Sequence, residues 1–469
     1  MPEAVQIYHR QELLQLRKDA DILCQETDVA DIRNWLEAGF PVIVRRPGTT
    51  AEGIHCGIPL PISGGLRRIP FRIPQEAVQE RLALPHLWDC LDELPSGQSV
   101  SEKLLSFKPE VFGSLAWQYL TGQEYLHVGS DLDLLIRVRN PGELQELLHV
   151  LPGIAAPFYD IEIMLWNNRS FSWREWMTST SSILVKSDHQ VFFLPKSLLT
   201  GDWQDTAAIA AAACDALREE LEAYPKPGLV SFLDNGSHAD MTAVHFTKAI
   251  GVLPEFFREL AEAGARLDGF AALQKIGLAA EQKMLEATGG VNTHRGAIFS
   301  LGLLCTAAGR KFSSGSSSSL GEIVRDCWGS DILQSRNPGS HGDQVLRKFG
   351  VRGAAAEAAA GFPAVYRLAL PALCSRPERN AARMQAFFAL LEKVSDTTLL
   401  YRGGKAGSEF AARAAAEFLH SGGTGSVDWK RRAAAIHQTF IDHKWSCGGI
   451  ADLLAAAIFI QQMEGIWQV

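Results

Sequence analysis

Two aspartates, Asp131 and Asp133, stand two residues apart at the start of the apolar run 131–138. In a β-strand, residues i and i+2 project from the same face, so these carboxylates would lie side by side. The segment 159–165 repeats the pattern with Asp160 and Glu162. If the two strands are neighbours, three carboxylates can share Mg²⁺ ions that bind a pyrophosphate. The alternative is that these side chains form the solvated faces of exposed strands.

Two Gly-Ser pairs accompany these segments. Gly113 and Ser114 precede an apolar helical stretch, and backbone N–H groups at a helix start suit phosphate oxygens. Gly129 and Ser130 come directly before Asp131 and are a second candidate for holding phosphate.

A second group of polar residues lies in glycine-containing loops between helical segments of the C-terminal half. The loops are 224–241, 289–304, 341–363, 395–404 and 445–455, and they contain Asp234, His238, Asp240, Asn292, His294, Arg295 and Asp452. Such a residue at a helix start commonly serves only as a cap or as a partner of the helix dipole. Together they indicate glycosidic-bond chemistry, in which a carboxylate activates a nucleophile and an oxocarbenium-like centre is stabilised.

The elements that must position these residues change in character near residue 204. Before it, the β-branched and aromatic runs 40–46, 131–138, 159–165, 181–187 and 190–195 alternate with helical stretches. After it, alanine-rich amphipathic segments dominate, at 205–224, 353–370, 380–394 and 449–463. We therefore predict an α/β (α+β) domain over residues 1–204 and an all-α domain over residues 205–469. The segment 194–205 is the expected linker, and the serine tract 311–323 is an expected surface loop between helices.

The composition narrows the classes of function. The net charge of −8 argues against a broad nucleic-acid surface, and no apolar run is long enough to span a bilayer. The eight cysteines form no CxxC pair, which favours reduced thiols over a disulfide framework or a zinc site. The N-terminal residues lack the apolar region of a secretion signal, so we expect a cytoplasmic protein that acts on neither nucleic acid nor membrane.

The order Gly-Ser, helix, then Ser-Asp-x-Asp and an aliphatic run resembles the nucleotidyltransferase superfamily that includes DNA polymerase β and the aminoglycoside nucleotidyltransferases. The resemblance implies a nucleotidyltransferase-like domain with a mixed sheet. It assigns phosphate binding to Gly113 and Ser114. Ser130 is then only the residue that precedes the strand with the metal-binding aspartates. Asp131, Asp133 and Asp160 then become the catalytic metal ligands. The spacing between Ser114 and Asp131 is longer than usual, which leaves room for an insertion at 121–127.

Within that superfamily, residues 1–200 resemble the holo-acyl-carrier-protein synthase of malonate decarboxylase, a phosphoribosyl-dephospho-CoA transferase. The segments that carry the resemblance are 41–46, 64–73, 130–137, 173–176 and 183–187. It implies transfer of a phosphoribosyl-dephospho-CoA group to a serine of the acyl-carrier subunit, with release of pyrophosphate. Arg67, Arg68 and Lys186 are the implied clamps for pyrophosphate or CoA phosphates, although each is equally well read as a solvated surface side chain.

Residues 205–469 resemble the triphosphoribosyl-dephospho-CoA synthase family in PKPGLV, GSHADM, GVNTHRGAIFSLGLL, GAAAEAAAGFPAV, DTTLLYRGG and CGGIADLLA. Members join the ribose C1 of ATP to the 2′-hydroxyl of 3′-dephospho-CoA and release adenine. The implied site residues are Lys226, Asp234, His238, Asp240, Asn292, His294, Arg295, Glu357, Asp396, Arg402 and Asp452.

The implied roles in this second site fall into three groups. Asp240 and Asp452, with Asp396, would hold Mg²⁺ on the triphosphate. The cations Arg295, Arg402 and Lys226 would bind phosphates. Another acid or His294 would activate the hydroxyl. Ser231 stands where the citrate-lyase version often has aspartate, which favours the malonate subfamily and leaves the role of Asp234 open.

The two resemblances describe consecutive reactions, so we expect a bifunctional transferase that uses ATP, 3′-dephospho-CoA, Mg²⁺ and an acyl-carrier subunit. One alternative is an N-terminal domain that adenylylates a protein or small molecule. Another is a non-catalytic scaffold that binds the carrier protein. A P-loop kinase is disfavoured, because the sequence has no GxxxxGK[ST] motif.

Overall fold

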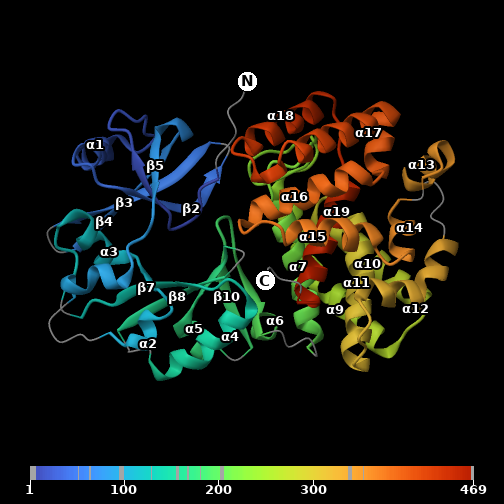
Figure 1. The fold of residues 1–469 in the computed structure, drawn as a ribbon, viewed down its shortest axis with the longest axis horizontal. Coiled ribbons are helices and arrows are strands. Elements are labelled where there is room, and N and C mark those ends of the chain that lie inside the picture. The colour runs from blue at the N-terminus through green and yellow to red at the C-terminus, as the bar shows by residue number, and fades with distance from the viewer. Residues whose placement is uncertain are drawn as a thin grey trace. The chain divides into compact units, whose positions relative to one another are not determined.

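The computed structural model describes residues 7–50, 52–62, 65–94, 100–127, 129–154, 158–165, 168–179, 181–200, 205–335, 341–351 and 353–465. The chain divides into two compact units, Gln6–Thr200 and a unit that contains Gly201–Val469. Part of the expected linker, 201–204, lies outside the described residues. Figure 1 shows strands and helices in the first unit and helices in the second.

The first unit begins with an antiparallel five-stranded sheet in the order β4-β3-β2-β1-β5. Its strands are β1 (Leu13–Leu16), β2 (Val42–Thr50), β3 (Gly53–Ile62), β4 (Gly65–Ile73) and β5 (Val78–Leu82), with helix α1 (Val29–Glu37) between β1 and β2. Alternate residues such as Ile69, Phe71 and Ile73 are buried, as expected of a sheet with one face on a core. The expected strand at 40–46 lies in β2, and the long β3–β4 hairpin was not predicted.

A six-stranded sheet follows in the order β11-β10-β9-β8-β7-β6. Its strands are β6 (Glu110–Val111), β7 (Leu132–Arg137), β8 (Tyr159–Met164), β9 (Ser170–Ser172), β10 (Ser182–Lys186) and β11 (Val191–Pro195). Its helices are α2 (Glu102–Leu105), α3 (Gly113–Thr121), α4 (Pro141–Val150), α5 (Trp173–Thr178) and α6 (Lys196–Thr200). Because β7 and β8 are parallel and the other pairs are antiparallel, the sheet is mixed.

The regular elements in the described residues of the second unit are all helices (Figure 1). Its first helices are α7 (Thr206–Glu222), α8 (Ala243–Val252), α9 (Pro254–Arg266), α10 (Phe270–Ala287), α11 (Arg295–Ser314) and α12 (Leu320–Gln334). The others are α13 (His341–Phe349), α14 (Ala354–Ala359), α15 (Leu370–Leu373), α16 (Arg379–Lys393), α17 (Thr397–His420), α18 (Trp429–Asp442) and α19 (Gly448–Met463). Small buried alanines on α7, α11 and α19 let these helices pack closely.

Two expectations for this unit need correction. The segment 353–370 is not one helix, because the chain turns at Gly361 (φ +83°) between α14 and the π-helical turn Val365–Ala369. The serine tract 311–323 is only partly a loop, since α11 continues through Ser314 and α12 begins at Leu320. Ser319 caps α12 by accepting a hydrogen bond from the Glu322 N–H.

None of the helices in the described parts of the chain has the length and apolar character needed to cross a lipid bilayer.

Candidate functional site

The strands that carry the acidic pairs are neighbours. In the parallel pair β7–β8, Asp133 is the register partner of Asp160. Asp131 directly precedes β7, so the three aspartates gather at the same end of the strand pair. Leu134 and Ile161, which project from the opposite face, are fully buried. The alternation seen in the sequence therefore places Asp133 and Asp160 on one face of the sheet and Leu134 and Ile161 on the other.

Asp133 is the electrostatic centre of this group. Burial, then the charges of Asp160 and Asp131, raise its pKa to about 6, although Arg68 and a hydrogen bond from the Ser114 N–H act in the opposite direction. Its ionised form is thus disfavoured by two like charges and by lost hydration. A bound cation would relieve this repulsion.

Gly113 allows helix α3 to begin directly beside the Asp133 carboxylate. Its φ is +66°, and a Cβ added there would lie 1.8 Å from Asp133 Oδ2. Phe112 N–H donates to the Asp133 carbonyl at 3.1 Å, which fixes the approach of the two elements. The Ser114 N–H, which the sequence assigns to phosphate, donates to the carboxylate instead. Phosphate binding by Gly113 and Ser114 stays a prediction.

The three predicted phosphate clamps have different surroundings. Arg68 is exposed on β4, and its charge acts on the nearby Asp133. Arg67 forms ion pairs with Asp28 and, at 2.9 Å, with Asp31, so its charge is already neutralised. Arg68 is therefore the better placed of the two to meet a phosphate at the carboxylates.

The third predicted clamp, Lys186, faces Glu162 with Nζ 3.6 Å from Oε2. Glu162 is buried and also pairs with Arg10 and Ser170. Burial alone would raise the pKa of Glu162, but Arg10, Lys186 and Ser170 outweigh it and hold the pKa below its usual value. Glu162 is therefore a fixed structural anion, and Asp160 is the freer of the two acids on β8.

Two residues near the carboxylates were missed by sequence reasoning. Arg174, on α5, forms an ion pair with Asp131 at 3.2 Å. Arg10 reaches Glu162 from the segment before β1. Of the two, only Arg174 lies in a segment that carried the family resemblance, 173–176.

The predicted residue Ser130 lies in a turn, where its Oγ accepts from the His127 N–H at 2.9 Å.

The metal assignments stay predictions in both units. Within the described ranges, no three His, Cys, Asp or Glu side chains are grouped as a metal ion would require. The donor set of Asp131, Asp133 and Asp160 nevertheless fits a hard cation, since it consists of oxygen ligands, and the charges of Asp131 and Asp160 act against that of Asp133.

A buried polar cluster forms where α7, α11, α17 and α19 come together in the second unit. Its members are Glu220, Lys226, His294, Asp396, Cys447 and Asp452, which act electrostatically on one another. Lys226 is 1% exposed, and its Nζ pairs with the Glu220 carboxylate and donates to the Glu220 carbonyl at 2.6 Å. The predicted role of Lys226 in phosphate binding is untested, and here its charge compensates Glu220.

Asp396 joins the starts of two helices. Its carboxylate accepts hydrogen bonds from the Leu399 N–H of α17 and the Ile450 N–H of α19, both at 2.8 Å. Burial raises its pKa, although these backbone donors oppose the rise. The carboxylate thus fixes the position of α19, the helix that carries Asp452.

Asp452 lies against α11 at a glycine. A Cβ on Gly296 would come 1.9 Å from Asp452 Oδ2, so only glycine leaves room for this carboxyl group. Burial, then the charges of Glu220 and Asp396, raise the pKa of Asp452 well above its usual value. Within the described residues, no hydrogen bond opposes this rise. The raised pKa favours the protonated form of Asp452, which can donate a proton.

His294 is the N-cap of α11 and is 3% exposed. Burial, then the nearby Lys226 charge, lower its pKa to about 3. Its Nδ1 lies 3.1 Å from Thr293 Oγ1, whereas its buried Nε2 has no hydrogen-bond partner among the described residues. The ring is therefore neutral and has one nitrogen available.

Charged residues at the edge of this cluster surround His238. Its Nε2 lies 3.0 Å from Ser446 Oγ, and its Nδ1 lies 3.5 Å from the Arg402 guanidinium and 3.9 Å from Asp240 Oδ1. Burial and the Arg402 charge lower the pKa of His238 to about 4. The Asp240 carboxylate is 68% exposed. Arg402 and Asp240 are thus accessible to a charged ligand.

Asp234 is held by a histidine that sequence reasoning missed. His437 Nε2 lies 3.1 Å from both Asp234 oxygens, and its Nδ1 lies 2.7 Å from the Lys226 carbonyl. Burial would raise the pKa of Asp234, but His437 and the Gly236 N–H outweigh it and lower the pKa. The pair therefore positions the loop that carries Lys226.

The remaining predicted residues make local contacts outside the cluster. Asn292 Oδ1 accepts from the N–H of Arg295, the first residue of α11, at 3.2 Å. The Arg295 guanidinium pairs with Glu281 at 2.8 Å. Glu357 Oε1 accepts from the Ala364 N–H at 2.6 Å and closes the turn after α14. Their roles toward substrate stay predictions.

Comparisons with known proteins match both units to family models. Residues 206–469 match the family model described as ATP:dephospho-CoA triphosphoribosyl transferase. Residues 9–83 and 79–197 match the N- and C-terminal domains of phosphoribosyl-dephospho-CoA transferase MdcG, and these ranges correspond to the two sheets. No solved structure matches the chain.

Two curated relatives share the name "Probable 2-(5''-triphosphoribosyl)-3'-dephosphocoenzyme-A synthase". The Acinetobacter calcoaceticus protein is 34% identical over 258 residues, which cover 53% of this chain and 88% of the relative. The Pseudomonas aeruginosa protein is 36% identical over 273 residues, which cover 55% and 91%. The chain therefore belongs to the ATP:dephospho-CoA triphosphoribosyl transferase family, here fused to both MdcG-type transferase domains, and it is an enzyme of the transferase class.

Proposed function

We propose that the chain makes a CoA-derived prosthetic group and attaches it to the acyl-carrier subunit of malonate decarboxylase. The C-terminal unit joins ATP and 3′-dephospho-CoA into 2′-(5″-triphosphoribosyl)-3′-dephospho-CoA and releases adenine. The N-terminal unit then transfers the phosphoribosyl-dephospho-CoA part to a carrier serine and releases pyrophosphate. The observation that carries the proposal is the presence of both family matches in one chain, because their reactions are consecutive.

The buried cluster of the second unit suits the first reaction. The ribose C1–N bond of ATP breaks, a bond from C1 to the 2′-oxygen forms, and the hydroxyl proton must leave. Asp452, whose raised pKa favours the protonated form, can donate a proton to the departing adenine. The available Nε2 of neutral His294 can accept the hydroxyl proton. Arg402 and Asp240 are accessible and can bind the triphosphate, the latter through Mg²⁺.

The carboxylates of the first unit suit the second reaction. The serine oxygen bonds to the α-phosphorus, the bond to the pyrophosphate oxygen breaks, and the serine proton leaves. Asp131, Asp133 and Asp160 would hold Mg²⁺, which would supply charge neutralisation at the phosphates. Asp160 can accept the serine proton, and Arg68 can bind the leaving pyrophosphate. This nucleotidyltransferase-like mechanism rests on the mixed sheet and its acidic strand pair.

The mass of the carrier subunit tests the second reaction. We expect wild-type chain with preformed triphosphoribosyl-dephospho-CoA and Mg²⁺ to add one phosphoribosyl-dephospho-CoA group to a serine. Asp131→Asn should abolish the addition, whereas the exposed Asp19→Asn should not. An added AMP, after incubation with ATP instead, would identify the N-terminal unit as an ordinary adenylyltransferase.

Adenine release tests the first reaction. Asp240→Asn should abolish adenine formation from ATP and dephospho-CoA, and the exposed Asp326→Asn is a matched control. Near-normal adenine release by Asp240→Asn would refute the role of this residue.

A further inference from the structure

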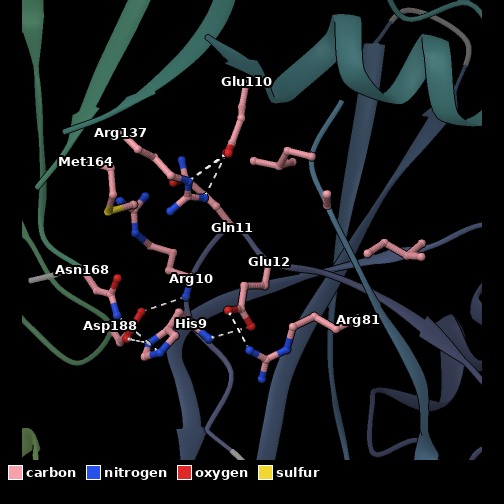
Figure 2. Close-up of a pocket in the computed structure, with 13 residues that line it drawn as sticks. His9, Arg10, Gln11, Glu12, Arg81, Glu110, Arg137, Met164, Asn168 and Asp188 are labelled. Atoms are coloured by element: carbon pink, nitrogen blue, oxygen red, sulfur yellow. Dashed lines mark hydrogen bonds and ion pairs between the residues drawn. The ribbon is translucent and has the colours of Figure 1, made fainter. Parts of the chain in front are cut away.

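The first unit contains a cavity of about 220 Å³ between its two sheets. Figure 2 shows the residues that line it, which come from both sheets and from the turns beside them. They are the segment His9–Glu12, the end of β5 (Arg81–Leu84), the strand residues Glu110, Arg137 and Met164, and the turn residues Asn168 and Asp188. The volume is below the roughly 300–1,000 Å³ of pockets that hold a whole drug-sized ligand, so it suits one ring of a larger molecule.

Gln11, one of the lining residues, carries a side-chain acceptor that has no partner among the described residues. The residue is 5% exposed, and its Nε2 donates to Glu162 at 3.4 Å. Its Oε1 is buried and has no hydrogen-bond partner among the described residues. An unpaired buried carbonyl is costly, so the site favours a ligand that brings an N–H donor.

The cations that line the cavity are already compensated. Arg137 Nε lies 3.0 Å from both oxygens of Glu110, and Arg81 pairs with Glu12 at 3.3 Å. His9 Nδ1 lies 2.6 Å from Asp188. An anionic ligand therefore gains little here. A guanidinium held by a carboxylate keeps its flat faces available, and such faces stack on aromatic rings.

The backbone is unusual at two of the lining residues. Gln11 has φ +70° and Asn168 has φ +58°, and these are two of six non-glycine residues with positive φ in the described chain. Such conformations occur disproportionately at ligand sites.

The cavity lies on the same sheet face as the aspartates. Arg137 and Met164 are register partners, each four residues beyond the paired Asp133 and Asp160. At about 3.3 Å per strand residue, the separation along the sheet is roughly 13 Å. In the proposed substrate, two linked ribose rings separate the reacting phosphorus from the adenine ring, which is a comparable length.

We propose that this cavity binds the adenine ring of the dephospho-CoA moiety, with Gln11 Oε1 accepting from the 6-amino group and Arg137 and Met164 against the ring. The inference rests on the proposed transfer reaction and adds the specificity determinant of that reaction. It makes the N-terminal unit selective for adenine over a base that carries oxygen at position 6.

The test compares triphosphoribosyl-dephospho-CoA with its hypoxanthine counterpart as substrates of the full-length chain, with carrier modification as the readout. In the wild type, we expect the hypoxanthine substrate to have a KM at least about tenfold higher, because two acceptors would face each other. Gln11→Met should raise the KM for the adenine substrate roughly three- to tenfold and abolish the discrimination between the two bases. Equal KM values for both bases in the wild type would overturn the inference.

A second variant pair tests the cavity itself. Ala83 is exposed at its rim, so Ala83→Trp should fill the cavity and raise the KM at least tenfold with little change in kcat. Gln79→Trp adds the same ring to an exposed residue of β5 outside the cavity and should behave as the wild type. Indistinguishable KM values for the two variants would overturn the inference. Absence of transfer by the wild type with the adenine substrate would instead refute the proposed function.

Discussion

Replacing Asp133 with Asn should stabilise the N-terminal unit while abolishing its transferase activity. The pKa of this carboxyl is about 6 rather than the ordinary 3.8, because of burial and the charges of Asp160 and Asp131. An acid whose pKa is raised by folding destabilises the folded state above that pKa. The destabilisation is absent below pH 3.8, grows between pH 3.8 and 6, and is complete above pH 6.

The magnitude follows from the same difference in pKa. It corresponds to about 3 kcal/mol for a fully shielded group. Because Asp133 is only partly buried, solvent screening reduces this, and we expect Asp133→Asn to stabilise the unit by about 1–2 kcal/mol at pH 8. Asparagine keeps an oxygen that can accept from the Ser114 N–H, so the change removes mainly the charge.

The assay is urea unfolding of the full-length chain, followed by a probe of the N-terminal unit, at pH 8 and pH 4. Asp133→Asn should raise the unfolding free energy at pH 8 and leave it unchanged near pH 4, whereas Asp19→Asn, at an exposed residue, should leave it unchanged at both pH values. Mg²⁺ should stabilise the wild type more than the variant. A variant that is less stable than the wild type at pH 8, or an effect that is equal at both pH values, would refute the electrostatic reasoning.

Three other changes have defined outcomes. Gly113→Ala should destabilise the N-terminal unit by at least about 2 kcal/mol and abolish carrier modification, because its Cβ would overlap Asp133; urea unfolding measures this, and adenine release should continue. Asp452→Asn should lower adenine release at least about 100-fold, measured by chromatography, while transfer of preformed triphosphoribosyl-dephospho-CoA stays normal. His294→Gln should slow adenine release without changing the shape of its pH profile between about pH 5 and pH 9, because the pKa of His294 is about 3; loss of a limb near neutral pH would contradict this.

The acidic strand pair was predictable from the sequence because it depends on local alternation. Asp131 lies directly before β7, and Asp133 and Asp160 are the second residues of β7 and β8. The parallel register of these strands places the three carboxylates together. Three of the four alanine-rich helices, α7, α16 and α19, were predictable for the same reason, since their periodicity is local, whereas the segment 353–370 is broken at Gly361. The division of residues 7–200 into two sheets was missed, because the proline-containing hairpin at 53–73 carries weak strand signals.

Contacts between distant segments could not be predicted. His437 follows the buried spacing of Ala433 and Phe440 on α18, so this segment looks like an ordinary amphipathic helix. The sequence therefore gives no sign that His437 binds Asp234. Likewise, Gln11 reaches Glu162 only through the packing of the two sheets. The ion pair between Lys186 and Glu162 could not be predicted either, because the sequence shows a charged residue but not its partner.

The mass of the carrier subunit after incubation with ATP, 3′-dephospho-CoA, Mg²⁺ and the full-length chain tests the central claim most directly. The account predicts that adenine and pyrophosphate are released and that a carrier serine gains one phosphoribosyl-dephospho-CoA group. Asp452→Asn should prevent this unless preformed triphosphoribosyl-dephospho-CoA is added, and Asp131→Asn should prevent it in either case. A carrier that stays unmodified by the wild type, or that gains only AMP, would contradict the account.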